Sequence, residues 1–154
     1  MCQAGAVRDE EAQGLAAALL AASRALVDGI SAGVGARGFG DVRPAHGFAF
    51  ARLVPDGATL TELAAHLDIS RQAATQMVVE LLAKGYVERR PHPVDARATL
   101  VTLTPRGWAC TEAAEAAIMD TARAWEAVLG ERVASRLRED LSRVAPHGPL
   151  RPTW

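Results

Sequence analysis

Two helix-capping signals eleven residues apart constrain this chain more than any other feature of its sequence. Thr59-Leu60-Thr61-Glu62 has the form of a capping box, in which the threonine and the glutamate each satisfy a backbone N–H group of the other. Ser70 can cap a second helix, and Gly85 suits the left-handed residue that follows a helix end. The sequence therefore predicts a short helix over 60–67, a tight turn, and a second helix over 70–84.

The hydrophobic period changes after Gly85. Residues 86–90 form a short strand pattern, and residues 98–103 alternate between apolar and polar side chains. The stretch Pro91-His92-Pro93-Val94-Asp95 cannot continue the first strand, because proline has no N–H to give to a sheet. The sequence thus predicts a hairpin with a long charged tip. Helix, turn, helix and hairpin is the element order of a winged helix-turn-helix.

Further helices are expected on both sides of this unit. Residues 9–36 place leucines and other apolar residues at steps of three and four, which puts them on one helix face. The glycine-rich stretch 33–40 ends this helix, because glycine in a helix interior costs about 1 kcal/mol. Pro44 and Pro105 suit the first positions of two further helices, and Gly130 separates the second of these from a last helix. These remaining helices cover 44–53, 105–129 and 131–144.

The expected fold is mainly α-helical with a small β-hairpin wing. We assign residues 41–104 to a winged helix-turn-helix DNA-binding domain, and residues 1–40 and 105–154 to flanking dimerisation helices. The flanking helices carry apolar stripes that one small module cannot cover, and a two-fold partner is the commonest solution. The stripes include Leu19, Leu26, Trp125, Leu129, Leu137 and Leu141. The sequence therefore predicts a homodimer.

The second helix of the pair has one apolar face and one slim polar face. Side chains that reach base edges lie near the N-terminal end of a recognition helix. Arginine can bind guanine there, glutamine can bind adenine, and a threonine methyl group can touch thymine. A capping serine can offer its hydroxyl group and the helix amides to a phosphate. The candidate groove-reading residues are Ser70, Arg71, Gln72, Thr75 and Gln76. Solvated surface residues are the alternative interpretation of this face.

Positive charge is concentrated in the middle of the chain. The whole chain has a net charge of −1, but residues 70–106 carry six Lys or Arg and three Asp or Glu. Arg89 and Arg90 leave the first strand and Arg97 enters the second, so the hairpin can clamp phosphates or a minor groove. Asp95 can hold Arg97 or the turn amides in place. An ordinary surface ion pair is the alternative for these two. Double-stranded DNA is the expected partner.

These motifs resemble the MarR family of transcriptional regulators. The most specific part is Asp95-Ala96-Arg97 followed by Leu103-Thr104-Pro105-Arg106-Gly107. The resemblance implies a triangular dimer joined by its terminal helices, which binds a palindromic operator and represses transcription by default. It implies a recognition helix in each major groove and a wing in the flanking minor groove. Arg97 looks like the wing-tip arginine and Asp95 its positioning partner. The prolines of this wing depart from the family pattern, which more often has an acidic or basic residue near them.

The resemblance also implies an effector. Many relatives release DNA when a small aromatic acid or phenol binds between the dimer helices and the winged domain. Candidate pocket residues in this chain are Phe39, His46, Phe50 and Trp108. Ordinary core packing is the alternative role for each of these four.

Other classes of function were weighed against this one. Cys2 or Cys110 could act as a thiol switch, although neither lies in a Cys-x-x-Cys or beside an activating cation. A winged-helix module that binds protein usually lacks such helix and wing arginines. No metal-ligand spacing, nucleophile motif or phosphate loop is present, so no enzyme, metal or cofactor is expected. The apolar run 15–26 contains Ser23 and Arg24 and is too short to span a membrane, which favours a cytoplasmic protein.

Overall fold

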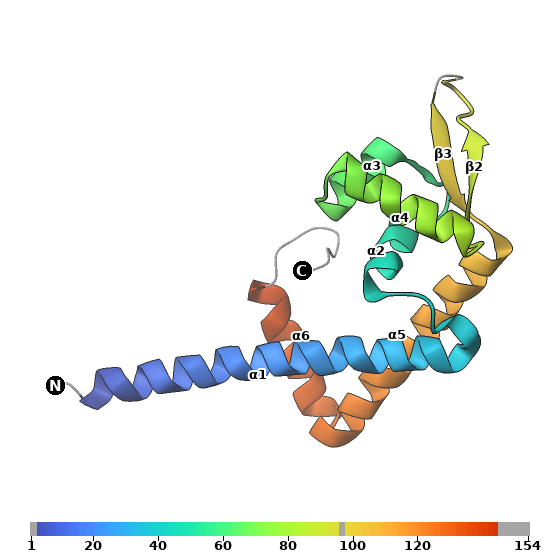
Figure 1. The fold of residues 1–154 in the computed structure, drawn as a ribbon. Helices are drawn as coiled ribbons and strands as arrows, with labels where there is room; N and C mark the ends of the chain where they lie inside the picture. Colours follow the sequence, from blue (N-terminus) through green and yellow to red (C-terminus); the bar gives the residue numbers. More distant parts are fainter. Residues whose placement is uncertain (1–2, 96–97, 145–154) are drawn as a thin grey trace.

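The computed structural model describes residues 3–95 and 98–144, with side chains from residue 9 onward. The chain is mostly helical with one small antiparallel sheet of three strands, which confirms the expected fold class (Figure 1). Two elements predicted from capping residues, α5 and α6, have the bounds that the sequence indicated. The elements are α1 (Gln3–Val34), α2 (Pro44–Leu53), β1 (Ala58–Thr59), α3 (Leu60–Leu67), α4 (Arg71–Ala83), β2 (Val87–Pro91), β3 (Thr99–Leu103), α5 (Pro105–Leu129) and α6 (Glu131–Val144).

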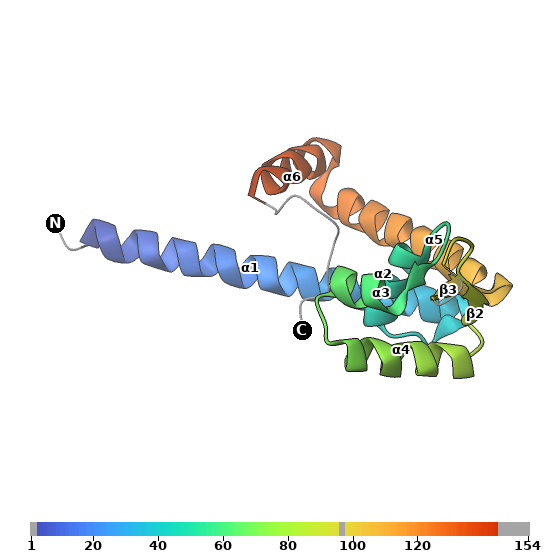
Figure 2. The same cartoon turned by 90° about the horizontal axis from the view of Figure 1, so that it is seen from above.

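The first helix is longer than the sequence predicted. It begins at Gln3 rather than residue 9, and it ends at Val34 in the glycine-rich stretch, where a kinked segment over Gly35–Phe39 follows with Gly38 at φ +92°. Its C-terminal half packs against α5 through small residues, since a Cβ atom at Gly33 would lie only 2.7 Å from the Ala117 Cβ. The N-terminal half of α1 stands clear of the rest of the chain in both views (Figures 1 and 2). That half therefore has no partner within the described chain.

The core lies between α2, α3, α4 and the sheet. Its largest fully buried side chains include Leu53, Leu63, Leu67 and Leu81. On α4, the predicted apolar face is confirmed. Ala74, Val78 and Leu81 are buried, and Met77 packs against this hydrophobic core. Val34, Cys110 and Ala117 join this cluster from α1 and α5. One continuous core therefore fastens the winged unit to the long helices.

The sheet contains a strand that the sequence did not indicate. Strand β1 pairs with β3, so the order is β1-β3-β2, and Ala58 lies opposite Val101. The turn before β1 requires glycine, because Gly57 has φ +84° and a Cβ there would lie 2.6 Å from the Val101 carbonyl oxygen. Two residues are too few for alternation to predict a strand.

The end of β2 corrects a second expectation. Pro91 was expected to lie outside the strand, but it pairs with Thr99 as the last residue of β2. Because β2 is an edge strand, the missing N–H of proline need not remove a ladder hydrogen bond. The first strand of the wing therefore begins and ends one residue later than predicted.

A close joint links the base of the wing to α5. The Thr104 N–H donates to the Tyr86 carbonyl oxygen at 3.0 Å, and the Thr104 side chain accepts the Gly107 N–H at 3.1 Å. This confirms the expected cap of α5. Gly107 lies against the same Tyr86 carbonyl, and a Cβ at this position would overlap that oxygen. Only glycine fits between the first turn of α5 and the start of β2.

Candidate nucleic-acid interface

The start of α4 has the geometry expected of a recognition helix. The Ser70 Oγ accepts the Ala73 N–H at 3.1 Å, which caps the helix and leaves the hydroxyl proton available for a phosphate. Arg71, Gln72 and Gln76 are exposed, and Thr75 is half-buried. Figure 2 shows α4 along one outer edge of the molecule, where a duplex can approach it.

Three of the five polar side chains on this face are not engaged by other described residues. Within residues 3–95 and 98–144, Arg71, Gln72 and Gln76 make no side-chain hydrogen bond or ion pair. The Thr75 hydroxyl donates to the Arg71 carbonyl at 2.7 Å, so its methyl group is the part that remains for a base. The structure thus brings the five predicted helix residues together on one accessible surface.

The wing arginines are divided between the two faces of the sheet. Directly opposed residues of an antiparallel pair share a face, and Arg89 is opposite Val101 whereas Arg90 is opposite Leu100. Arg89 therefore projects on the side of the core, beyond its edge, and Arg90 projects on the other side. The Arg90 Nη2 lies 2.5 Å from the Glu88 Oε1, on its own face. The two arginines therefore lie on opposite faces of the hairpin.

The tip of the wing contains a hydrogen-bonded turn. The His92 Nδ1 accepts the backbone N–H groups of Val94 and Asp95, at 3.2 and 3.1 Å. Asp95 is exposed, and its carbonyl oxygen accepts the Ala98 N–H at 3.0 Å. Arg97 lies outside the described residues, so its pairing with Asp95 stays a prediction. His92 was not among the residues singled out from the sequence.

Two cations and a histidine converge on Glu80 near the C-terminal end of α4. Arg43 and Lys84 both donate to its carboxylate, Lys84 at 2.7 Å, and the His46 Nε2 lies 3.6 Å away. The hydrogen bond from Lys84, with help from the nearby cations, keeps the pKa of Glu80 below its ordinary value. This cluster fastens the end of the recognition helix to the start of α2. The only sign of this cluster in the local sequence was that Glu80 and Lys84 are four residues apart on one helix, where their side chains can meet.

His46 is a core residue in this structure. It is fully buried, its Nδ1 accepts the Arg43 backbone N–H at 3.2 Å, and its Nε2 lies 3.1 Å from the Arg43 guanidinium. Burial lowers the pKa of His46, and the positive charges of Arg43 and Lys84 lower it further, against the opposing effect of Glu80. A buried neutral histidine capping α2 matches the core-packing alternative.

The other expected effector residues do not gather in one cavity. Phe39 and Phe50 both contact the Tyr86 ring, with centroid distances of 6.3 and 5.7 Å, whereas Trp108 is partly exposed. The Arg106 guanidinium lies 4.6 Å from the Tyr86 ring centroid and donates to the Tyr86 hydroxyl at 3.0 Å. Burial and a hydrogen bond to Asp41 raise the pKa of Tyr86 to about 12. Tyr86 and Arg106, the centre of this cluster, were missed by sequence reasoning.

The environment of Cys110 does not favour thiol chemistry. The side chain is only 1% exposed, and burial raises the pKa of its thiol to about 11. Because the thiolate is the reactive form, such a cysteine is poorly reactive near neutral pH. Cys2 lies outside the described residues.

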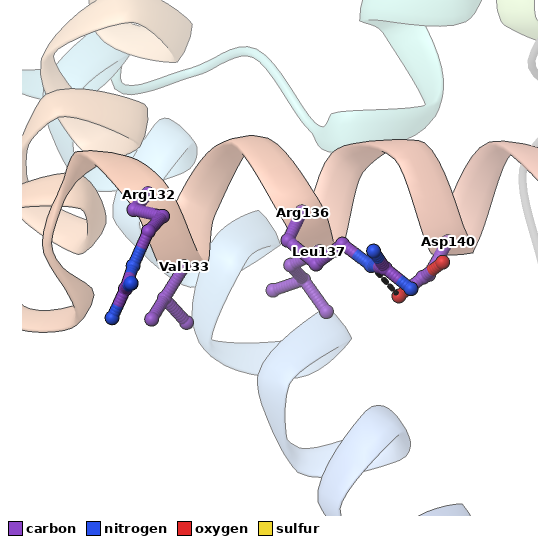
Figure 3. A pocket seen from close by; sticks show the side chains of 5 residues that line it. All are labelled: Arg132, Val133, Arg136, Leu137 and Asp140. Atoms are coloured by element: carbon purple, nitrogen blue, oxygen red, sulfur yellow. Dashed lines mark hydrogen bonds and ion pairs between the residues drawn. The ribbon is translucent and has the colours of Figure 1, made fainter.

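An open hollow of about 470 Å³ runs along α6. It is lined by Arg132, Val133, Arg136, Leu137 and Asp140, and none of the four expected effector residues contributes to it (Figure 3). Arg136 pairs with Asp140 at 2.8 Å, beside the exposed side chains of Val133 and Leu137. No residue of α6 is buried, although its apolar side chains recur at helical spacing.

One segment departs from the expectation that no part of the chain could span a membrane. By length and composition alone, the helical stretch Asp9–Phe39 is long and apolar enough to do so. None of its most apolar 18-residue window is buried within the chain. The sequence argument considered a shorter run and underestimated the length of this helix.

Comparisons with known proteins agree with the motifs. A model of the MarR family matches residues 49–98. The multiple antibiotic resistance proteins MarR of Salmonella typhimurium and Salmonella typhi are each 46% identical to this chain over 54 residues. That stretch is 35% of this chain and 38% of each relative, so the match spans well under half of their length.

Solved structures extend the likeness to most of the chain. The reduced form of MarR from E. coli is 30% identical, with a TM-score of 0.61 over 69% of this chain and 79% of that one. A mutant of MarR from E. coli complexed with operator DNA is 25% identical, with a TM-score of 0.68 over 88% and 96%. The YusO protein from Bacillus subtilis shares the fold at 21% identity, with a TM-score of 0.69 over 89% and 98%.

Proposed function

This chain belongs to the MarR family of transcription regulators, and we propose that it binds a palindromic operator as a homodimer and represses transcription. In this proposal residues 41–104 form the DNA-binding domain, and the segments 1–40 and 105–154 form the dimer. The observation that carries the proposal is the exposed, uncommitted polar face at the start of α4. The solved E. coli relative in complex with operator DNA supports DNA as the partner.

The face of α4 suits direct readout of a major groove. An arginine and two glutamines can each form paired hydrogen bonds with base edges, and each good pair discriminates by about 1–3 kcal/mol. The side chains of Arg71, Gln72 and Gln76 lie free at the end of the helix where such contacts occur. Ser70 adds a hydroxyl group that can position the helix on a phosphate. We therefore assign base reading to this face and phosphate contact to its cap.

The wing supplies further positive charge beside that helix. We propose that Arg89, Arg90 and Arg97 contact the backbone or the flanking minor groove, with Asp95 as the support of Arg97. The division of Arg89 and Arg90 between two sheet faces favours contacts with different phosphates. Each phosphate that a cation neutralises adds to the salt dependence of binding.

A homodimer accounts for the apolar surface that the chain leaves uncovered. Leu15 and Leu20 on α1 are 63% and 73% exposed, and Val133, Leu137 and Leu141 on α6 are between 38% and 49% exposed. A two-fold partner can cover both stripes at once. A long apolar helix can be covered by a dimer partner as well as by a membrane. We propose that a partner covers α1 and that the dimer is cytoplasmic. Two α4 helices about 34–36 Å apart would read a palindrome.

An effector is the less developed part of the proposal. A half-exposed Arg106 over the rings of Phe39 and Tyr86 offers a cation and an aromatic face for an aromatic acid or phenol. Binding there would act on the joint between α5 and the wing. Phe50 and His46 are then supporting core residues rather than direct ligands, and Trp108 is a nearby fluorescent reporter.

The decisive experiment is selection of duplex DNA from a random-sequence library by the purified chain. We expect enrichment of a palindromic motif and an affinity that falls steeply as salt rises. Replacement of Arg71 by alanine should cost about 1–3 kcal/mol and relax the sequence preference at one position of each half-site. Arg123→Ala removes an equally exposed arginine outside α4 and the sheet and should leave binding unchanged. Selection without any enriched motif, or binding indifferent to salt, would overturn the proposal.

A further inference from the structure

The tip of the wing is held by a histidine side chain. We propose that His92 is a positioning residue for DNA binding, because its imidazole fixes the turn that leads to Asp95, the proposed support of Arg97. The inference rests on the proposed function, since it concerns how the wing meets DNA. Nothing in the sequence motifs pointed to this residue, which lies in the part of the wing that departs from the family pattern.

Both the ring and the backbone of His92 fasten the turn. The Nδ1 atom accepts the N–H groups of Val94 and Asp95, at 3.2 and 3.1 Å. The backbone N–H of His92 donates to the Ala98 carbonyl oxygen at 3.1 Å, across the mouth of the loop. The Ala98 N–H returns to the Asp95 carbonyl at 3.0 Å. One residue thus closes the loop at its base and also satisfies two successive donors at its tip.

The neighbouring prolines make this arrangement specific. Pro91 and Pro93 flank the histidine, and a residue before proline is confined to extended conformations. Pro93 also has no N–H, so Val94 and Asp95 are the first donors that follow the histidine. The imidazole occupies the position that an aspartate or asparagine side chain takes when it accepts a backbone N–H two residues ahead. The backbone of the turn is therefore fixed by the prolines, and its donors are fixed by the ring.

This role requires Nδ1 to act as a hydrogen-bond acceptor. A ring nitrogen that accepts an N–H carries no proton, so the ring proton of His92 lies on Nε2.

An ordered tip reduces the cost of binding. Val94 is 90% exposed, so packing against the body of the protein does not hold this residue of the turn. Without the two hydrogen bonds of the ring, the tip would have to be ordered when DNA binds, at the expense of affinity. Two hydrogen bonds with a net contribution of about 1 kcal/mol each correspond to a loss of affinity of about tenfold or more.

The test compares the native chain with His92→Asn and His92→Ala. The probe is a duplex that the native chain selects from a random library. Asparagine can accept the same N–H groups, so His92→Asn should bind within about threefold of the native chain. Alanine has no acceptor, so His92→Ala should bind about tenfold more weakly than the native chain.

Three results would overturn the inference while leaving the proposed function intact. One is a His92→Ala affinity equal to that of the native chain. Another is a His92→Asn affinity as low as that of His92→Ala. The third is nitrogen NMR of the DNA-free chain that places the neutral-ring proton on Nδ1. Failure to select any duplex would instead refute the proposed function, and thermal unfolding of all three chains checks that they fold.

Discussion

Glu88 and Arg90 lie two residues apart on β2, on the same face of the sheet, and their side chains form an ion pair of 2.5 Å. The same arginine is one of the wing cations assigned to DNA. The carboxylate therefore competes with DNA phosphate for this guanidinium group. This competition makes the wing less cationic in the free protein than its arginines suggest.

We predict that Glu88→Gln strengthens DNA binding. Release of Arg90 should raise the affinity several-fold at low salt and make the dependence of log K on log salt steeper by about one unit, because one more phosphate is neutralised. Fluorescence anisotropy at a series of salt concentrations measures both. The double variant Glu88→Gln, Arg90→Ala is the control. If the gain persists in that double variant, the ion pair is not its source.

The stability of the chain should fall below pH 6.5 because of His46. Its pKa is lowered in the folded chain, mainly by burial, so the unfolded chain binds this proton at a higher pH than the folded chain does. The contribution of His46 to the free energy of unfolding should therefore be fully present above the ordinary histidine pKa of about 6.5. It should decrease as the pH falls toward the pKa of His46 in the folded chain. Glu80, Asp41 and Glu62 have lowered carboxylate pKa values, which affect stability only at more acidic pH.

Urea unfolding at pH 7.5, 6.5 and 5.5 tests this prediction. His46→Gln should be less stable at pH 7.5 but should lose most of the decline between pH 6.5 and 5.5. His66→Gln removes another histidine, on α3, and should keep that decline. Parallel declines in the native chain and in His46→Gln would show that another group titrates.

Cys110 should resist oxidation in the folded protein. Its thiol is buried and has a pKa of about 11, so little thiolate exists at neutral pH. In a Cys2→Ser background, a thiol reagent should label the native chain far more slowly than the chain in urea. Peroxide should leave DNA affinity unchanged. Fast labelling without urea, or a peroxide-sensitive affinity, would revive the thiol-switch interpretation.

The apolar face of α6 should be required for dimerisation. Leu137→Glu places a charge in the middle of that face and should shift the sedimentation coefficient toward a monomer, with weaker DNA binding as a consequence. Ser135→Glu places the same charge elsewhere on the helix, about 200° around from Val133, and should leave the dimer intact. A Leu137→Glu chain that still sediments as a dimer would move the interface away from α6.

Local chemistry explains which elements the sequence predicted. Thr59, Ser70 and Thr104 each cap a helix by accepting the N–H of a residue three positions later. A short stretch of sequence is therefore enough to predict these helix starts. The exposed face of α4 followed from helical periodicity in the same way. These signals located the winged unit and its polar helix surface.

The features that were missed depend on contacts between distant residues. Strand β1 exists because Ala58 pairs with Val101, and the charged cluster at Glu80 depends on Arg43 from another helix. The aromatic contacts of Tyr86 with Phe39 and Phe50 join three separate segments. Consecutive residues of a strand point to opposite faces, but the register of the hairpin was needed to show that Arg89 is the one on the side of the core. Such relations follow from packing, which no local spacing reveals.

The overlap that any side chain at position 107 would make with the Tyr86 carbonyl has a mechanical consequence. The first turn of α5 and the root of the wing are in contact through backbone atoms, with no soft side chain between them to absorb a displacement. A tilt of α5 would therefore move the wing and the end of α4 with it as one rigid body. In a symmetric pair, the angle between the two α5 helices would then dictate how far apart the two reading surfaces stand. Whatever alters that angle would change which spacing of half-sites the protein can span.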